Sequence, residues 1–252
     1  MPQPDARRAI VREDYDAVLL DLDGVITDTA SVHAACWKEL FDAYLKERAA
    51  RGGEAFHPFD LSADYRLYVD GKPRFDGVRD FLASRNIRLP DGNSGDPPEI
   101  ETVCGLGNRK NSLFDKVIEE KGVKAYEGSI QLIDQLRQRG VKLAVVTSSQ
   151  NCTIVLKAAG LVGLFDVLVD GNVISAQHLA GKPAPDMFLL AAKLLGVEPA
   201  RAVVIEDAIS GVQAGRNGSF GLVVGVARKG NSEELRANGA DVVVADLGEL
   251  VR

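Results

Sequence analysis

The chain has 252 residues, which is long enough for one large domain or two smaller ones with a substantial hydrophobic core. Its 30 Lys and Arg residues against 36 Asp and Glu residues give a net charge of −6, which disfavours a broad nucleic-acid-binding surface. The apolar runs are no longer than strands and the first residues, MPQPDARR, lack the apolar stretch of a secretory signal, so we expect a cytoplasmic protein that does not enter a membrane.

The chain begins with a polar, proline-bearing segment, residues 1–14, which we interpret as a loose lead-in. The apolar run Ala17–Leu20 then predicts a short buried parallel strand, followed at once by Asp21, Asp23 and Gly24. In an open parallel sheet, ligands bind at the carboxyl ends of the strands. Two carboxylates so close together favour a metal ion or acid/base chemistry. The alternative is an ordinary polar turn, in which Asp and Gly serve the backbone.

Residues 31–124 contain helical patterns and no pattern that predicts a strand. A long helix is expected from Ser31, its N-cap, to the glycines at 52 and 53. Shorter helical patterns follow, separated by a turn at residues 70–74 and a flexible loop at residues 90–98: residues 62–69, 75–85 and 105–122. His33 and Trp37 share one face of the long helix, where core packing and contact with a ligand both remain open. We therefore expect an all-helical domain inserted after the first strand.

From residue 125 onwards, strands and helices alternate. The helices are expected at residues 129–139, 153–159, 186–195 and 211–216, and the strands at 141–149, 166–169, 202–205, 221–226 and 241–244. Alternation at this spacing predicts a parallel sheet with helices on both faces. The predicted fold is thus a Rossmann-like, doubly wound α/β core of residues 1–30 and 125–252 with a helical cap domain, residues 31–124, inserted in it.

Further polar groups follow the strands of this predicted sheet. They are the Thr147-Ser148-Ser149 run, Lys182 in AGKPAPD, and the Glu206-Asp207 pair. Each has an ordinary explanation, as helix caps or a solvated lysine. A sheet, however, brings its strand ends to one edge, so hydroxyls, a lysine and four acids would meet there. That combination is typical of phosphoryl transfer at a metal site.

Four segments in order, DLDGVITDT, VVTSS, GKPAPD and IEDAISG, resemble the four motifs of the haloacid dehalogenase-like phosphotransferases. Within that superfamily the chain is most similar to the β-phosphoglucomutase branch, which carries a helical cap between the first strand and the rest of the core. The segments DTASVHAACWKELF and GKPAPDMF, the NRKN run and the loop of residues 71–74 carry that closer likeness. The resemblance covers both the cap and the core.

The resemblance implies a role for each strand-end residue. Asp21 would be the nucleophile that forms an aspartyl phosphate, and Asp23 the general acid and base. Mg²⁺ would be held by the Asp21 carboxylate, the Asp23 backbone carbonyl, and Asp207 with Glu206 nearby. Thr147, Ser148 and Lys182 would bind the transferring phosphoryl oxygens. The implied contacts to a sugar phosphate are Asp23, Gly24, Thr29, His33, Trp37, Gly71, Lys72, Arg74, Lys110, Asn111, Ser149, Gln150 and Asn151.

The chain departs from this branch at two positions, where Asp70 and Gln150 stand in place of lysines. A bisphosphate needs cations at both ends of its sugar, so these changes favour simple phosphatase activity, although Lys72, Arg74 and Lys110 could compensate.

Three functions therefore stay open: interconversion of β-glucose 1-phosphate and glucose 6-phosphate through a bisphosphate, hydrolysis of a sugar or polyol phosphate, and binding without catalysis. The last would require a lost catalytic acid, and none is lost. We expect a sugar phosphate as the small-molecule partner, no nucleic acid or membrane partner, and a monomer, with a weak dimer as the alternative.

Overall fold

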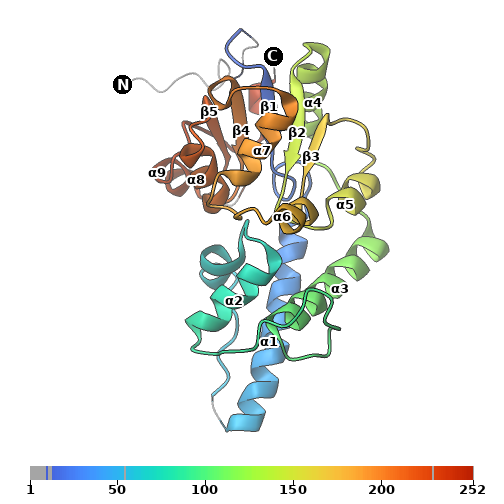
Figure 1. Cartoon of the computed structure of the whole chain (residues 1–252), viewed down its shortest axis with the longest axis vertical. Helices are drawn as coiled ribbons and strands as arrows, with labels where there is room; N and C mark the ends of the chain where they lie inside the picture. The colour runs from blue at the N-terminus through green and yellow to red at the C-terminus, as the bar shows by residue number, and fades with distance from the viewer. Residues whose placement is uncertain (1–9, 11–12, 54, 229, 252) are drawn as a thin grey trace. The chain divides into compact units, whose positions relative to one another are not determined.

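The computed structural model describes residues 10, 13–53, 55–228 and 230–251 (Figure 1). Most of the predicted lead-in lies outside these residues. The chain divides into two compact units, which are described separately: an α/β unit of residues 1–28 and 123–252, and a helical unit of residues 29–122.

The α/β unit is built on a parallel sheet whose described residues form six strands in the order β3-β2-β1-β4-β5-β6. The strands are β1 Ala17–Leu20, β2 Lys142–Val146, β3 Val167–Val169, β4 Ala202–Glu206, β5 Leu222–Val226 and β6 Val242–Val244. β1 is central and fully buried, and its last residue, Leu20, is level with Val145 of β2 and Ile205 of β4. The residues that follow these three strands therefore emerge at the same edge of the sheet.

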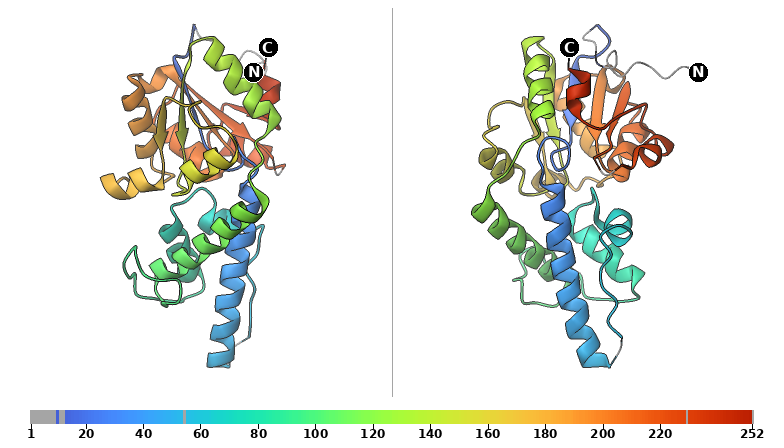
Figure 2. Two further views of the ribbon diagram at one scale, coloured as in Figure 1. Left: turned by 90° about the vertical axis from the view of Figure 1, so that its right-hand side faces the viewer. Right: turned by 180° about the vertical axis from the view of Figure 1, so that it is seen from behind.

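Helices cover both faces of this sheet, as Figure 2 shows with α4 on one side and α7 and α8 on the other. They are α4 Glu127–Gln138, α5 Cys152–Ala158, α6 Gly171–Gln177, α7 Asp186–Leu195, α8 Ile209–Asn217 and α9 Ser232–Ala237, with short 3-10 turns at Pro199–Arg201 and Leu247–Leu250. Alternate strand residues face each layer: Ala17 and Leu19 of β1 pack with Phe188 of α7 in one buried cluster. The predicted doubly wound α/β fold is confirmed.

The helical unit contains α1 Ala30–Gly52, a π-helical turn Tyr65–Val69, α2 Arg74–Ser84 and α3 Val103–Lys121, and no strand occurs among its described residues. Its core is rich in aromatic side chains: the Phe41 ring lies 4.1 Å from that of Phe81 and 5.2 Å from that of Phe59. Such ring pairs supply much buried area from few residues. None of the helices in the described ranges combines the length and apolar character that a bilayer-spanning segment needs.

One local prediction was wrong, and two helices were missed. Ser31 is not the N-cap of the long helix, because α1 already begins at Ala30 and Thr29 occupies the capping position. α6 and α9 were not predicted at all. The start of α6 is fixed by Asp170, whose side chain accepts hydrogen bonds from the backbone N–H groups of Asn172 and Val173.

Candidate active site

The predicted acidic residues come together at the carboxyl-terminal edge of the sheet. Asp21 follows β1, and its N–H donates to the carbonyl of Ile205 at 3.0 Å, so the residue continues the pairing with β4. Glu206 ends β4 and Asp207 follows it. Carboxylate oxygens of Asp21, Glu206 and Asp207 all lie within 4.8 Å of one another, and all three residues are buried. Without a cation such a cluster is strongly unfavourable.

Lys182 supplies one such cation. Its Nζ donates to Asp21 Oδ1 at 2.6 Å, to Glu206 Oε1 at 2.5 Å and to the carbonyl of Val146 at 3.1 Å. The side chain is fully buried. The lysine, which is distant from both acids in sequence, therefore ties the ends of β1, β2 and β4 together.

Burial and charge act on these groups in opposite directions. Burial raises the pKa of Asp21 well above its usual value; the charge of Lys182 lowers it, and the Glu206 and Asp23 carboxylates raise it further. For Lys182, burial alone would lower the pKa, but the charges of Asp21 and Glu206 and its hydrogen bonds to them outweigh burial and raise it. Lys182 is therefore held in its charged form, and one cation faces the three carboxyl groups of the cluster.

Two glycines let the backbone approach these carboxylates closely. Gly24 has a left-handed φ of +88°, and a Cβ atom built on it would lie 2.2 Å from Asp207 Oδ2. A Cβ on Gly211 would lie 1.9 Å from the Glu206 carboxylate. Side chains at either position would collide with an acid of the cluster. This explains why glycine stands at both.

The acidic cluster fits a magnesium ion. Its donor atoms are all oxygens, the groups that Mg²⁺ prefers, and the cluster keeps a negative charge that a divalent cation would neutralise. The members are not equivalent, however. Glu206 Oε1 accepts from Lys182 and Oε2 accepts from the N–H of Ala208 at 3.1 Å, so both of its oxygens are already bound. Which of the three carboxylates would bind the ion stays a prediction.

The hydroxyl run after β2 forms a tight loop before α5. Thr147 Oγ1 accepts from the N–H of Ser149 at 3.1 Å, and Ser149 Oγ accepts from the N–H of Asn151 at 3.2 Å. The carbonyl of Gln150 accepts from the Asn172 side chain at 3.0 Å, which joins the loop to the start of α6. Thr147 is buried at the end of β2, the strand next to β1. Ser148 Oγ lies 3.9 Å from Met187 Sδ. Their contact with a phosphate stays a prediction.

Most of the predicted sugar-phosphate residues of the helical unit fall into two groups, and two others lie outside them. In the first, Lys110 Nζ is hydrogen-bonded to His33 Nδ1 and lies 5.3 Å from the Trp37 ring and 5.0 Å from the Phe114 ring. Trp37 is only 4% exposed and belongs to the unit's core, stacked on Phe41. Core packing is therefore established for Trp37. A role for these side chains in binding substrate stays a prediction.

The second group surrounds the turn between the π-helical segment and α2. Gly71 takes a left-handed φ of +70°, as the turn requires. Lys72 Nζ donates to Asp80 at 2.6 Å, and Arg74 donates to Asn108 Oδ1 at 3.1 Å while lying over the Phe75 ring. The remaining predicted residues are Asn111, whose amide donates to Asp115 at 2.9 Å, and Thr29, the residue before α1.

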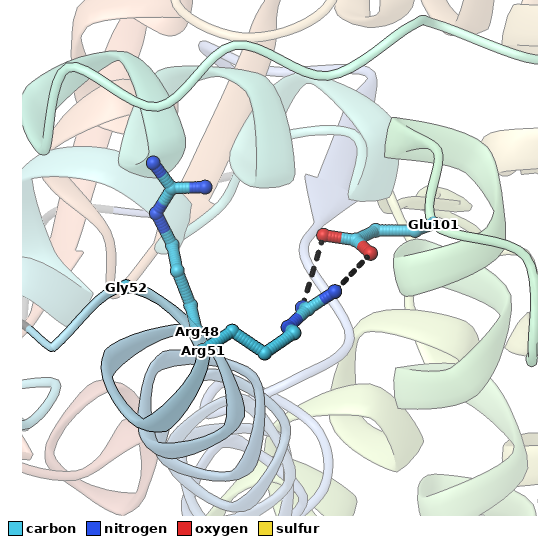
Figure 3. A pocket seen from close by; sticks show the side chains of 4 residues that line it. All are labelled: Arg48, Arg51, Gly52 and Glu101. Atoms are coloured by element: carbon cyan, nitrogen blue, oxygen red, sulfur yellow. Dashed lines mark hydrogen bonds and ion pairs between the residues drawn. The ribbon is translucent and has the colours of Figure 1, made fainter.

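The helical unit also contains a hollow of about 240 Å³ at the end of α1, lined by Arg48, Arg51, Gly52 and Glu101 (Figure 3). Arg51 points to Glu101 and forms two hydrogen bonds with it, at 3.0 and 3.3 Å. None of the predicted site residues lines this hollow. Two of its three charged side chains, Arg51 and Glu101, pair with each other.

One side chain beside the acidic loop is absent from the predictions. Arg228, two residues after β5, donates from Nε to the carbonyl of Gly24 at 3.1 Å. Its position two residues beyond the end of β5 was the available signal. A single arginine in a loop is too common to stand out on that ground.

The fold and this site define a class of protein: an enzyme that acts on phosphate groups, with a carboxylate and a lysine at the end of a central parallel strand. Residues 15–218 match the family model described as haloacid dehalogenase-like hydrolase. The chain belongs to this family, in its β-phosphoglucomutase branch.

Individual relatives agree with this placement. A β-phosphoglucomutase of Mycobacterium tuberculosis is 52% identical over 253 residues, which cover 99% of this chain and 97% of the relative. Among solved structures, a hydrolase from Pseudomonas syringae has a TM-score of 0.75 at 26% identity and covers 93% of this chain and 95% of its own. The β-phosphoglucomutase from Clostridium difficile has a TM-score of 0.73 at 27% identity, with coverages of 94% and 93%.

Proposed function

We propose that this protein is a magnesium-dependent β-phosphoglucomutase, which interconverts β-D-glucose 1-phosphate and glucose 6-phosphate through an aspartyl phosphate and glucose 1,6-bisphosphate. The observation that carries the proposal is the 52% identity to the M. tuberculosis β-phosphoglucomutase along 99% of the chain, which includes both units. A likeness limited to the α/β unit would support the chemistry alone. Specificity for a sugar depends on the inserted unit as well.

In the proposed reaction the Asp21 carboxylate attacks the phosphorus atom of a bisphosphate, and the bond from phosphorus to the sugar oxygen breaks. Asp23 gives its proton to that oxygen as it leaves, and withdraws a proton from the sugar hydroxyl that later attacks the aspartyl phosphate. Lys182 stays in place at 2.6 Å from Asp21 and offers positive charge to the phosphoryl oxygens.

Mg²⁺ would be held by the Asp21 and Asp207 carboxylates and the Asp23 carbonyl, with Glu206 beside them. When bound, it reduces the repulsion between the anionic nucleophile and the anionic phosphate. The chain's own contribution is to orient Asp21. Its N–H is fixed to Ile205 and its Oδ1 to Lys182, which leaves the carboxylate little freedom before a substrate arrives.

The second candidate is a phosphatase that uses the same aspartyl phosphate and lets water complete the reaction. Asp70 and Gln150, in place of the lysines of the branch, favour it, as does the similarity to the P. syringae hydrolase. The two candidates share every group at the sheet edge. They differ only in whether the sugar returns as the second phosphate acceptor.

The test is to incubate the protein with β-D-glucose 1-phosphate, Mg²⁺ and a small amount of glucose 1,6-bisphosphate. Glucose 6-phosphate is read through a coupled dehydrogenase, and free phosphate is measured in parallel. A mutase forms glucose 6-phosphate far faster than phosphate and needs the bisphosphate primer. Phosphate release that accounts for all substrate consumed would establish the phosphatase instead. α-D-Glucose 1-phosphate serves as the anomer control.

Arg74→Ala is expected to reduce mutase turnover by roughly 10²-fold, because a partly buried guanidinium that binds one phosphate bidentately contributes on the order of 2–3 kcal/mol. Phosphoenzyme formation from acetyl phosphate, which has no distal phosphate, should stay within about twofold. The measurement is the ratio of the two rates. Arg79→Ala, which removes an exposed arginine of the same helix paired with Asp76 and Asp91, is the matched control. Equal losses on both substrates would remove the distal-phosphate role from Arg74.

A further inference from the structure

The loop that carries Asp21 and Asp23 is compact in itself. The N–H groups of Ile26 and Thr27 both donate to the carbonyl of Leu22 at 2.9 Å, and the N–H of Gly24 donates to the carbonyl of Thr27 at 2.8 Å. These bonds fix the internal shape of residues 22–27. They do not fix how the loop as a whole is oriented on the end of β1.

Two successive carbonyls on the outside of the loop are held by side chains from other segments. Ser129 Oγ, in the first turn of α4, donates to the carbonyl of Val25 at 2.6 Å. Arg228 Nε donates to the carbonyl of Gly24 at 3.1 Å. The Gly24 carbonyl belongs to the Gly24–Val25 peptide, one residue beyond Asp23, so its attachment limits how far the segment that bears the proposed acid can shift.

Arg228 is itself held from two sides. Its guanidinium lies 3.6 Å from the centre of the Tyr126 ring, and Nη1 donates to Asp246 Oδ2 and, at 3.3 Å, to the carbonyl of Ala245. The side chain is 14% exposed, which is low for an arginine. A guanidinium with a ring on one face and a carboxylate at one edge can present Nε in only one direction.

The anchors of Arg228 are fixed in turn. Asp246 Oδ1 accepts from the N–H of Gly248 at 2.8 Å in the capping box of the last 3-10 turn. Tyr126 donates its hydroxyl proton to Asp28 at 2.9 Å, and its N–H donates to the carbonyl of Ile26 at 3.0 Å. The side chain of Arg228 therefore connects the Asp21–Asp23 loop with two other segments of the α/β unit, at Tyr126 and at residues 245–246.

We propose that Arg228 is a positioning residue: by holding the Gly24 carbonyl between Tyr126 and Asp246, it keeps the Asp23 side chain in line with the oxygen that leaves phosphorus. Asp21 does not depend on it, because Lys182 and the pairing with β4 fix Asp21 separately. Loss of Arg228 should thus impair proton transfer and spare nucleophilic attack. The inference rests on the aspartyl-phosphate chemistry of the proposed function, and not on the identity of the sugar.

Two aryl phosphates distinguish a loss of proton transfer from a loss of nucleophilic attack. 2,4-Dinitrophenolate leaves phosphorus without a proton, whereas phenolate needs one. The rate of phosphoenzyme formation is measured for both in a rapid-quench experiment with saturating Mg²⁺. Asp23→Ala is the reference variant. Its rate of phosphoenzyme formation is expected to fall about 10²-fold with phenyl phosphate and about twofold or less with the dinitrophenyl ester. Arg228→Met should lose about tenfold on phenyl phosphate and keep the dinitrophenyl rate within twofold, with Arg228→Lys between Arg228→Met and the unchanged protein.

The control is Arg216→Met, which removes an exposed arginine whose ion pair with Asp241 spans 3.5 Å. It should change neither rate. A fall of equal size on both esters in Arg228→Met, or no fall on phenyl phosphate, would overturn the proposal, because a purely structural residue does not distinguish leaving groups. If Arg228→Met does not fold, the rates with the two esters are compared in Arg228→Lys and Asp246→Asn instead, and the same criterion applies: a fall confined to phenyl phosphate supports the proposal, and an equal fall on both esters overturns it.

The aryl ester experiment is independent of the mutase assay. A protein that forms no glucose 6-phosphate but shows the leaving-group effect would keep the role of Arg228 and lose the proposed substrate. The reverse result would keep the mutase and lose the positioning role.

Discussion

Replacing Asp21 with asparagine is expected to lower turnover by roughly 10⁴-fold or more, because the amide cannot form the phosphoenzyme on which both candidate activities depend. Phosphoenzyme is measured by intact-protein mass after mixing with acetyl phosphate, and turnover by glucose 6-phosphate and phosphate release. The variant should add no phosphoryl mass. Asp16→Asn, at the opposite end of β1 and paired at the surface with Arg201, is the matched control and should retain activity.

The fold of the Asp21→Asn variant should survive. Burial and the neighbouring acids raise the pKa of Asp21, which means that its charge is unfavourable in the folded protein, and a neutral amide relieves that repulsion while its oxygen still accepts from Lys182. The melting temperature is expected to match or exceed that of the unchanged protein. Phosphoenzyme on the variant, or turnover within tenfold of normal, would exclude Asp21 as the nucleophile.

Lys182→Met is expected to produce the largest loss of stability, about 3–5 kcal/mol in the free energy of unfolding, since it leaves the Asp21 and Glu206 carboxylates buried without their cation. Urea unfolding without added metal measures it. Lys142→Met is the matched control, because the Nζ of Lys142 donates to the carbonyl of Leu195 and binds no acid, and a loss of about 1 kcal/mol is expected there.

A second substitution tests the electrostatic cause. Adding Glu206→Gln to Lys182→Met removes one of the two stranded charges, so the double variant should be more stable than the sum of the single losses predicts. Strict additivity would mean that the lysine stabilises the fold through packing of its stem against Phe188, over whose ring its Nζ lies, and not through charge.

Much of the fold follows from local patterns in the sequence. The bounds of β1 and α7 are those predicted, because a fully apolar run before two acids and a ten-residue amphipathic helix that ends at a glycine are unambiguous. α6 is different, since a seven-residue helix begun by Asp170 depends on a single cap. The start of α1 also escaped prediction, because the general preference for serine over threonine at the N-cap favoured Ser31, whereas the helix begins after Thr29.

The candidate site, like the fold, was predictable from the sequence only in part. That Asp21, Thr147 and Asp207 lie at the same edge of the sheet follows from strand topology alone, since each residue directly follows a strand. The division of labour among the acids does not follow. Glu206 and Asp207 are adjacent and chemically alike, yet Glu206 accepts hydrogen bonds from Lys182 and Ala208, whereas the Asp207 carboxylate lies against Gly24. Only three-dimensional distances distinguish them, and the same holds for Arg228.

The two chain segments that lead into and out of the helical unit run side by side within the α/β unit. The N–H of Asp28 donates to the carbonyl of Lys124 at 2.9 Å, and Thr27 and Ala125 form an antiparallel bridge. Residues 29–122 are therefore an insertion whose two ends are already joined, and the entropy of closing such a loop grows only by about 0.6 kcal/mol for each doubling of its length. The α/β unit can thus accept inserts of very different size at this point, so under the proposed function the unit that contributes to sugar selection can change in evolution while the unit that would carry the phosphoryl group stays the same.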